Sequence, residues 1–263
     1  MKNMLRSSRR PRAAFTLVEL LVVIAIIGIL AAMILPALAV AKTAALKAKA
    51  KMEASDLVTA IQAYDADYGR FPVSAAAQNI ATVNAKFGKN PDFTYGGNFF
   101  QPDGSAYAVQ TQGLLLTNDE VISILMDITN YPSGAATVNN GHVKNPKQNK
   151  YLSVKMQTDT KSPGVGTDLV YRDPWGNPYI ITMDLSYDDQ CEDAFYARQQ
   201  VSQQNGTAGY NGLVCPSSGG DHFQYHGKVM VWSVGPPIHG KPGIDPTLPA
   251  TDPANKNHIL SWQ

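Results

Sequence analysis

The side chains that could do chemistry are few and are spread along the chain. Asp221, His222 and His226 include an H-x-x-x-H pair, which would suit a transition metal if both rings shared one face of a helix. Glycines flank the pair on both sides, so a loop without a metal is favoured. The sequence has no H-E-x-x-H, G-x-S-x-G or P-loop motif. We therefore expect neither an enzyme nor a bound cofactor.

The two cysteines, Cys191 and Cys215, are better explained by structure than by catalysis. An even count in a domain outside the cytoplasm favours one disulfide, closing a loop of about 25 residues. A cysteine nucleophile beside a histidine is the weaker alternative. The residues between the cysteines are polar and rich in turn formers, which predicts an exposed, flexible loop.

Charge is distributed unevenly along the 263 residues. Residues 1–14 carry five cations and no acid, and removing those five from the net charge of +1 leaves −4 for the rest. A mildly acidic remainder without a basic stripe argues against nucleic acid as a partner. Hydrophobic residues make up 44% of the chain and crowd into its N-terminal fifth. This pattern predicts one membrane segment followed by one domain.

Residues 20–41 contain no charged side chain and exceed the roughly 20 residues that a helix needs to cross a bilayer. A secretory signal peptide has a shorter apolar region, followed by an A-x-A-like cleavage site that is missing here. We therefore predict a membrane-spanning helix. Cations precede this run and four lysines follow it between residues 42 and 51, so charge leaves its orientation open.

Glu19 places a carboxylate at the start of the apolar run. At mid-bilayer such a charge costs about 3 kcal/mol on insertion scales, so it would need a partner. From its position alone, Glu19 could equally lie near the lipid headgroups. The surrounding residues favour a carboxylate that enters the membrane and needs a partner there.

The segment Ala13-Ala14-Phe15-Thr16-Leu17-Val18-Glu19 resembles the processing site of type IV prepilins and pseudopilins, over about residues 9–40. The resemblance implies that a prepilin peptidase cuts between Ala14 and Phe15 and methylates the new N-terminus. Ala14 stands where glycine is commonest in the family. Glu19 would be the fifth mature residue, and its carboxylate would pair with the N-terminal amine of a neighbouring subunit, so that each charge offsets the other's desolvation.

Pro36 lies inside the apolar run, where it removes one backbone hydrogen bond and should kink or locally melt the helix. The family has a proline at the same distance from the cut, in a stretch that can unwind during assembly. The helical pattern continues to Tyr68, with an apolar face at Leu57, Ile61, Tyr64 and Tyr68, and ends at Gly69. The predicted parts are a leader (1–14), a membrane and filament-core helix (15–41), an amphipathic helix (42–68) and a globular domain (69–263).

For the globular domain we predict an α+β fold, in which the long helix packs on a small antiparallel sheet. Residues 73–112 lack a clear period and predict a connecting region. A capping-box pattern at 117–120 predicts a helix that ends before residue 132. Alternating residues predict strands at 151–156, 179–185 and 228–234.

Asp173, Pro174, Trp175 and Gly176 begin a turn by their chemistry, since proline fixes a backbone angle and glycine can take a positive one. We expect Trp175 to anchor this turn on the core rather than to bind a ligand. The turn resembles the "DPWGNPY" turn of the major pseudopilin of type II secretion systems, which narrows the family.

Residues 228–236 resemble the pseudopilin strand and loop that often precede a calcium site. The acids expected after this strand are missing, and only Asp245 and Asp252 remain as weak calcium candidates. Two carboxylates seven residues apart fall short of the six or more oxygens that this cation takes.

The resemblance implies a structural subunit of a type II secretion pseudopilus, held in the inner membrane by one helix with its C-terminal domain in the periplasm. Its implied partners are the prepilin peptidase, other copies of the chain, minor pseudopilins and the inner-membrane assembly platform. Two alternatives stay open: a type IV pilin or minor pilin for adhesion or DNA uptake, and a membrane-anchored binding domain that never polymerises.

Overall fold

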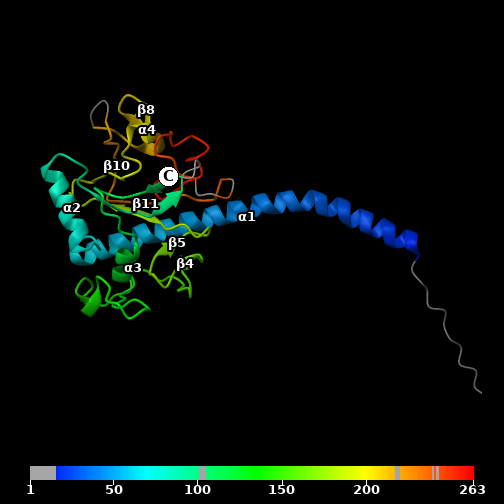
Figure 1. Cartoon of the computed structure of the whole chain (residues 1–263), viewed down its shortest axis with the longest axis horizontal. Coiled ribbons are helices and arrows are strands. Elements are labelled where there is room, and N and C mark those ends of the chain that lie inside the picture. Colours follow the sequence, from blue (N-terminus) through cyan, green and yellow to red (C-terminus); the bar gives the residue numbers. More distant parts are fainter. Residues whose placement is uncertain (1–15, 101–104, 217–219, 239, 241–242) are drawn as a thin grey trace, which may run out of the picture. The chain divides into compact units, whose positions relative to one another are not determined.

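A computed structural model describes residues 16–100, 105–216, 220–238, 240 and 243–263 (Figure 1). The chain divides into two compact units, Met1–Ala45 and Leu46–Gln263. Helix α1, Leu17–Tyr68, contributes to both of them. The predicted cut between Ala14 and Phe15 lies outside the described residues.

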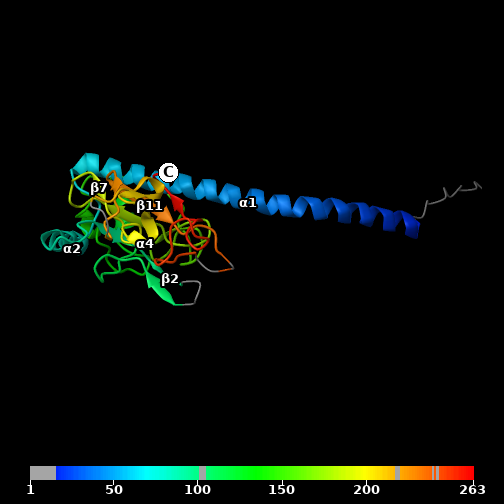
Figure 2. The same ribbon diagram turned by 90° about the horizontal axis from the view of Figure 1, so that it is seen from above.

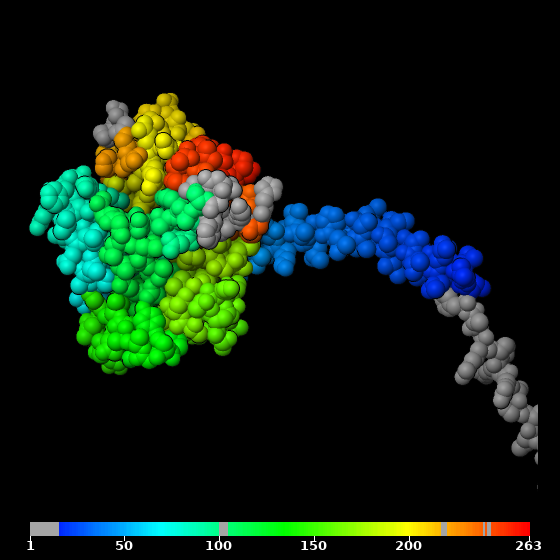
Figure 3. Space-filling view, viewed as in Figure 1, coloured from blue at the N-terminus to red at the C-terminus, as the bar shows by residue number. Residues whose placement is uncertain are grey.

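The described part of the first unit, residues 16–45, is almost entirely helical. Its large apolar side chains, from Leu17 to Val40, are exposed, as the blue surface in Figure 3 illustrates. The helix runs through Pro36 without interruption, so the predicted melting at this residue is not present in the single chain. An uninterrupted apolar helix of this length is able to cross a membrane.

Within the second unit, α1 buries one face. Leu57, Ile61 and Tyr64 have no exposed surface, and Tyr68 is partly buried against the same core cluster, which confirms the predicted apolar stripe. The helix ends at Gly69, whose φ of 61° is a left-handed conformation that favours glycine, and whose N–H donates to the Asp65 carbonyl at 2.7 Å.

The main sheet has four antiparallel strands in the order β1-β6-β11-β12. These strands are β1 (Phe93–Tyr95), β6 (Ile180–Met183), β11 (Val229–Ser233) and β12 (Ile259–Leu260). The predictions of strands at 179–185 and 228–234 are confirmed. Together with α1, the sheet gives the predicted α+β arrangement (Figure 2).

Both faces of this sheet are covered, so neighbouring residues of a strand enter different cores. Ile181 and Val231 lie in a cluster with Leu57 and other α1 side chains. Ile180 and Trp232 lie in a second cluster, built mainly from residues after position 190. The alternation of side chains along a strand therefore connects α1 to the C-terminal part of the domain.

Short elements complete the domain. The helices are α2 (Ala75–Lys86), α3 (Asp119–Leu125), α4 (Gln199–Ser202) and the 3-10 turns η1 (Asn140–His142) and η2 (Tyr210–Gly212). The paired strands are β2 (Asn98–Phe100) with β3 (Ala106–Ala108), β4 (Gly164–Val165) with β5 (Tyr171–Arg172), β7 (Gln190–Cys191) with β10 (Tyr225–His226), and β8 (Gln203–Asn205) with β9 (Ala208–Gly209).

Several predictions for the domain were wrong. Residues 73–112 form α2 and three strands rather than a connection, and 151–156 form only an isolated bridge at Met156. The helix predicted after residue 117 is present as α3, but without its capping box. Its N-cap is Asn118, whose buried amide instead donates to the carbonyls of Tyr171 and Tyr179. Tertiary hydrogen bonds have replaced the local cap.

The segment between the cysteines is exposed at residues 204–208, as its polarity predicted, but it is built from short helices and strands rather than a featureless loop. It contains α4, β8, β9 and η2, and Val201 and Ser202 are fully buried. Ser202 donates to the carbonyl of Tyr196, which is also buried. A polar sequence can thus be internal when its hydrogen-bonding groups find partners.

Candidate functional site

Glu19 forms a reciprocal cap with Thr16 at the beginning of α1. Its carboxylate accepts hydrogen bonds from the Thr16 N–H at 2.8 Å and from the Thr16 hydroxyl at 2.7 Å. In return, the Thr16 hydroxyl accepts from the Glu19 N–H at 3.2 Å. This is a capping box, which satisfies helix N–H groups that have no partner within the helix.

Sequence reasoning missed this role of Thr16, although the T-x-x-E spacing of residues 16–19 carries the signal. The cap has a chemical consequence, because it holds the carboxylate at the N-terminal end of the apolar helix. The predicted cut would create a new amine one residue before Thr16. Glu19 is therefore placed where a carboxylate can meet an N-terminal amine of its own or of another chain.

The Asp173 turn is braced by a buried carboxylate rather than by its tryptophan. Asp173 has no exposed surface, and its Oδ1 accepts from the N–H groups of Trp175 at 2.8 Å and Asn177 at 2.9 Å. Its Oδ2 accepts from the Ser233 hydroxyl at the end of β11. Burial raises the pKa of Asp173, while these donated hydrogen bonds favour its charged form.

Trp175 does not anchor the turn as predicted. Its side chain is partly exposed and belongs to neither core cluster. Pro174 is also partly exposed, and Gly176 adopts a φ of 89° with its Cα facing the Lys161 carbonyl. An added Cβ at Gly176 would lie 2.7 Å from that oxygen, so both the angle and the space require glycine.

The predicted disulfide between Cys191 and Cys215 is not formed. Both residues are buried, but a strand lies between them: Cys191 pairs with Tyr225 on one edge, and Gln224 exchanges two 2.9 Å hydrogen bonds with Val214 on the other. Strands two positions apart are separated by about 9–10 Å, beyond the limit of about 7 Å between the Cα atoms of a disulfide. Burial raises the pKa of Cys191.

The H-x-x-x-H pair does not lie on a helix. His226 is in β10 and its Nδ1 lies 2.8 Å from Gln190 Nε2, while His222 Nδ1 lies 3.4 Å from a carboxylate oxygen of Glu192. Asp221 accepts a hydrogen bond from the backbone of α4. Among the described residues, no cluster of three or more His, Cys, Asp or Glu side chains is placed to hold a metal.

The two weak calcium candidates lie in one loop, but each carboxylate has a local partner. Asp245 Oδ1 accepts from the N–H and hydroxyl of Thr247 at 2.9 and 2.7 Å. Asp252 Oδ1 accepts from the Ala254 N–H at 2.8 Å. These carboxylates therefore stabilise turns of the loop.

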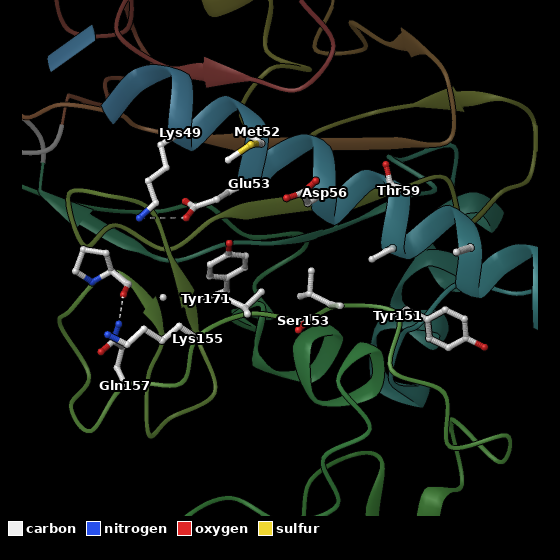
Figure 4. A pocket seen from close by; sticks show the side chains of 16 residues that line it. Lys49, Met52, Glu53, Asp56, Thr59, Tyr151, Ser153, Lys155, Gln157 and Tyr171 are labelled. Atoms are coloured by element: carbon white, nitrogen blue, oxygen red, sulfur yellow. Dashed lines mark hydrogen bonds and ion pairs between the residues drawn. The ribbon is translucent and has the colours of Figure 1, made fainter. Parts of the chain in front are cut away.

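A groove of about 700 Å³ runs along the second half of α1 (Figure 4). Glu53 and Asp56 line it from the helix, opposite Ser153 and Lys155. Glu53 is engaged within the fold, since Tyr179 donates to it at 2.7 Å and Lys49 Nζ lies 3.7 Å away. The lining of the groove also includes Lys49, Thr59 and Tyr171, so that polar side chains line it on both sides.

Comparison with known proteins identifies the N-terminal segment. Residues 9–35 match the family model of the prokaryotic N-terminal methylation motif. No curated protein and no solved structure matches the chain. The motif includes Glu19 and supports a type IV pilin-like or pseudopilin protein, and it implies processing by a prepilin peptidase and assembly into pilus-like filaments. The exposed apolar helix and the motif together fit membrane anchoring.

Proposed function

We propose that this chain is a structural subunit of a type II secretion pseudopilus. After cleavage and N-methylation at Phe15 it would assemble, from the inner membrane, into a filament that carries the domain of residues 69–263 in the periplasm. The observation that carries this proposal is Glu19, capped by Thr16 at the start of an exposed apolar helix and inside the methylation motif. The role is structural and requires neither a catalytic site nor a cofactor.

Glu19 favours an assembly element over a simple anchor. A simple anchor needs only an apolar helix, and a carboxylate at its start adds a desolvation cost. A filament subunit recovers that cost when the carboxylate pairs with the N-terminal amine of a neighbouring copy. The exposed apolar side chains of α1 contact lipid while the chain is in the membrane, and they contact neighbouring subunits in the filament core.

One feature favours a pseudopilus within this class: the Asp173 turn resembles that of the major pseudopilin. Its buried carboxylate, which accepts from the Ser233 hydroxyl, fixes the turn against β11. The proposed partners are the peptidase, the minor pseudopilins and the assembly platform. A type IV pilin or minor pilin is the second candidate, because the methylation motif is common to both kinds of filament.

The test is Glu19→Ala in cells that express the secretion system, with Val18→Ala as the matched control. Both changes shorten an exposed side chain at the same end of α1. We expect both proteins to enter the membrane, and only Glu19→Ala to lose filaments and cross-linked ladders. A normal filament yield from Glu19→Ala would refute the proposal.

Two further observations separate the alternatives. Antibody labelling of intact cells that reveals long surface filaments would favour a pilin. Membrane cross-linking of the wild-type chain that yields discrete monomers without a ladder would favour a non-polymerising anchor.

A further inference from the structure

One buried amide organises the loop of residues 243–255. Asn255 is 1% exposed, and its Nδ2 donates to the carbonyl oxygens of Asp245 at 2.8 Å, Leu248 at 2.9 Å and Pro249 at 3.2 Å. Its Oδ1 accepts from the Asp245 N–H at 2.8 Å. Carbonyls from separate turns of the loop therefore converge on a single nitrogen.

Converging carbonyl oxygens repel one another unless a positive group lies between them. A hard cation such as Ca²⁺ provides that group in many protein loops, where it takes carbonyl and carboxylate oxygens. Here the partly positive amide hydrogens of Asn255 provide it instead. The two carboxylates of the loop, Asp245 and Asp252, are turned to backbone and hydroxyl donors of their own segments.

The loop is also held from outside, so its carbonyls should keep their positions when Asn255 is changed. The Ala250 N–H donates to the Val201 carbonyl of α4 at 2.8 Å. Ile244 is fully buried in the second core cluster. At the start of the loop, the Gly243 carbonyl lies 2.7 Å from His258 Nε2.

We propose that Asn255 occupies the position of a cation in this loop, so that the domain keeps its fold without calcium. The proposal has a second part: replacing Nδ2 by oxygen, as in Asn255→Asp, converts the cage of carbonyls into a calcium site. The aspartate would bring a negative charge to three carbonyl oxygens that lose the Asn255 donor. Carbonyl and carboxylate oxygens are the ligands that a hard cation takes, with water completing its coordination shell. The proposal concerns the fold of the domain and does not depend on filament assembly.

The test compares thermal unfolding of the full chain in detergent with calcium chloride and with a chelator, for wild type, Asn255→Asp and Asn255→Ala. Tryptophan fluorescence reports on the domain, because Trp175, Trp232 and Trp262 all lie within it. We expect the same unfolding midpoint for wild type in both conditions. Both variants should unfold at lower temperature in chelator, and calcium should raise the midpoint of Asn255→Asp by several degrees but leave Asn255→Ala unchanged. Magnesium, which demands tighter octahedral geometry, should raise it less.

Two results would overturn the proposal. A rise in the wild-type midpoint on adding calcium would show that the native loop binds the cation, and this measurement needs no variant to fold. Equal behaviour of Asn255→Asp and Asn255→Ala in calcium, with no heat of binding when calcium is titrated into Asn255→Asp, would show that the carbonyls do not form a cation cage.

Discussion

The two halves of α1 solve the problem of a hydrophobic helix in opposite ways. From Leu17 to Val40 its large apolar side chains are exposed, whereas Leu57, Ile61 and Tyr64 are completely buried within the domain. The first half therefore needs partners that the single chain does not supply, and the second half has them in the sheet. The comparison teaches that one helix can serve two independent purposes: the first half for membrane and assembly, the second for the stability of the domain.

The largest effect on this comparison should come from truncating matched leucines in the two halves. Leu57→Ala leaves a cavity between α1 and the sheet and should lower the free energy of unfolding by about 3 kcal/mol. Leu30→Ala removes an exposed side chain of the first half and should leave that free energy unchanged. Denaturant unfolding in detergent, followed by tryptophan fluorescence, measures both. Similar losses from the two variants would contradict the division of roles.

A second pair of variants asks what holds the turn that precedes β6. Asp173→Ala leaves the Trp175 and Asn177 N–H groups and the Ser233 hydroxyl without their acceptor, and should cost about 2 kcal/mol. Trp175→Ala shortens a partly exposed side chain and should cost less than about 1 kcal/mol. The same unfolding assay distinguishes them, and a larger loss from Trp175→Ala would restore the tryptophan as the anchor.

The third prediction uses pH to compare the charge-free stretch of α1 with the globular domain. Residues 20–41 contain no ionisable side chain, whereas in the domain burial lowers the pKa of His258 to about 4. The histidine of the unfolded chain titrates near pH 6.5, so between about pH 6.5 and 4 the unfolded state binds a proton that the folded state does not. Stability from this group is therefore present above that window and decreases as pH falls through it.

His258→Asn removes this contribution. The free energy of unfolding of the wild type should fall by about 2 kcal/mol more than that of the variant when the pH is lowered from 7.5 to about 4.5. Denaturant curves at the two pH values give this difference of differences, in which other titrating groups cancel. A constant difference across the range would show that His258 is not held neutral by the fold.

The smallest effect concerns the polar link between α1 and Tyr179, the residue that precedes β6. The Tyr179 hydroxyl donates to Glu53 at 2.7 Å and lies 3.3 Å from the Ala50 carbonyl. Tyr179→Phe keeps the ring in the core and loses these contacts, so it should cost about 1 kcal/mol. Glu53→Gln keeps an acceptor for the tyrosine and should cost less. Equal losses would indicate that charge, rather than the hydrogen bond, makes the link.

The parts of the fold that could be predicted are those where a local pattern and its tertiary use agree. The stripe at Leu57, Ile61 and Tyr64 has a helical period and faces the core, and residues 180–183 and 229–233 alternate as strands. The helix at residues 75–86 was not predicted. It is rich in alanine and polar residues and buries only one narrow face, so its hydrophobic period is weak.

The candidate site residues likewise differ in whether a local sequence pattern predicts them. Glu19 and its spacing from Phe15 could be read from the chain because the chemistry is local. The Ser233 contact of Asp173 and the strand between Cys191 and Cys215 depend on segments far apart in the sequence, which no local pattern contains. The contacts of Asn255 cross a loop whose path the sequence does not specify. Thr16 is the exception, since its capping box was present in the sequence and was overlooked.

The central claim is that the chain is a processed filament subunit, and N-terminal mass spectrometry of the purified protein tests it most directly. The account predicts a mature chain that begins at an N-methylated Phe15. A terminal peptide that still carries residues 9–14 ahead of Phe15 would contradict it, because Glu19 would then have no new amine to meet.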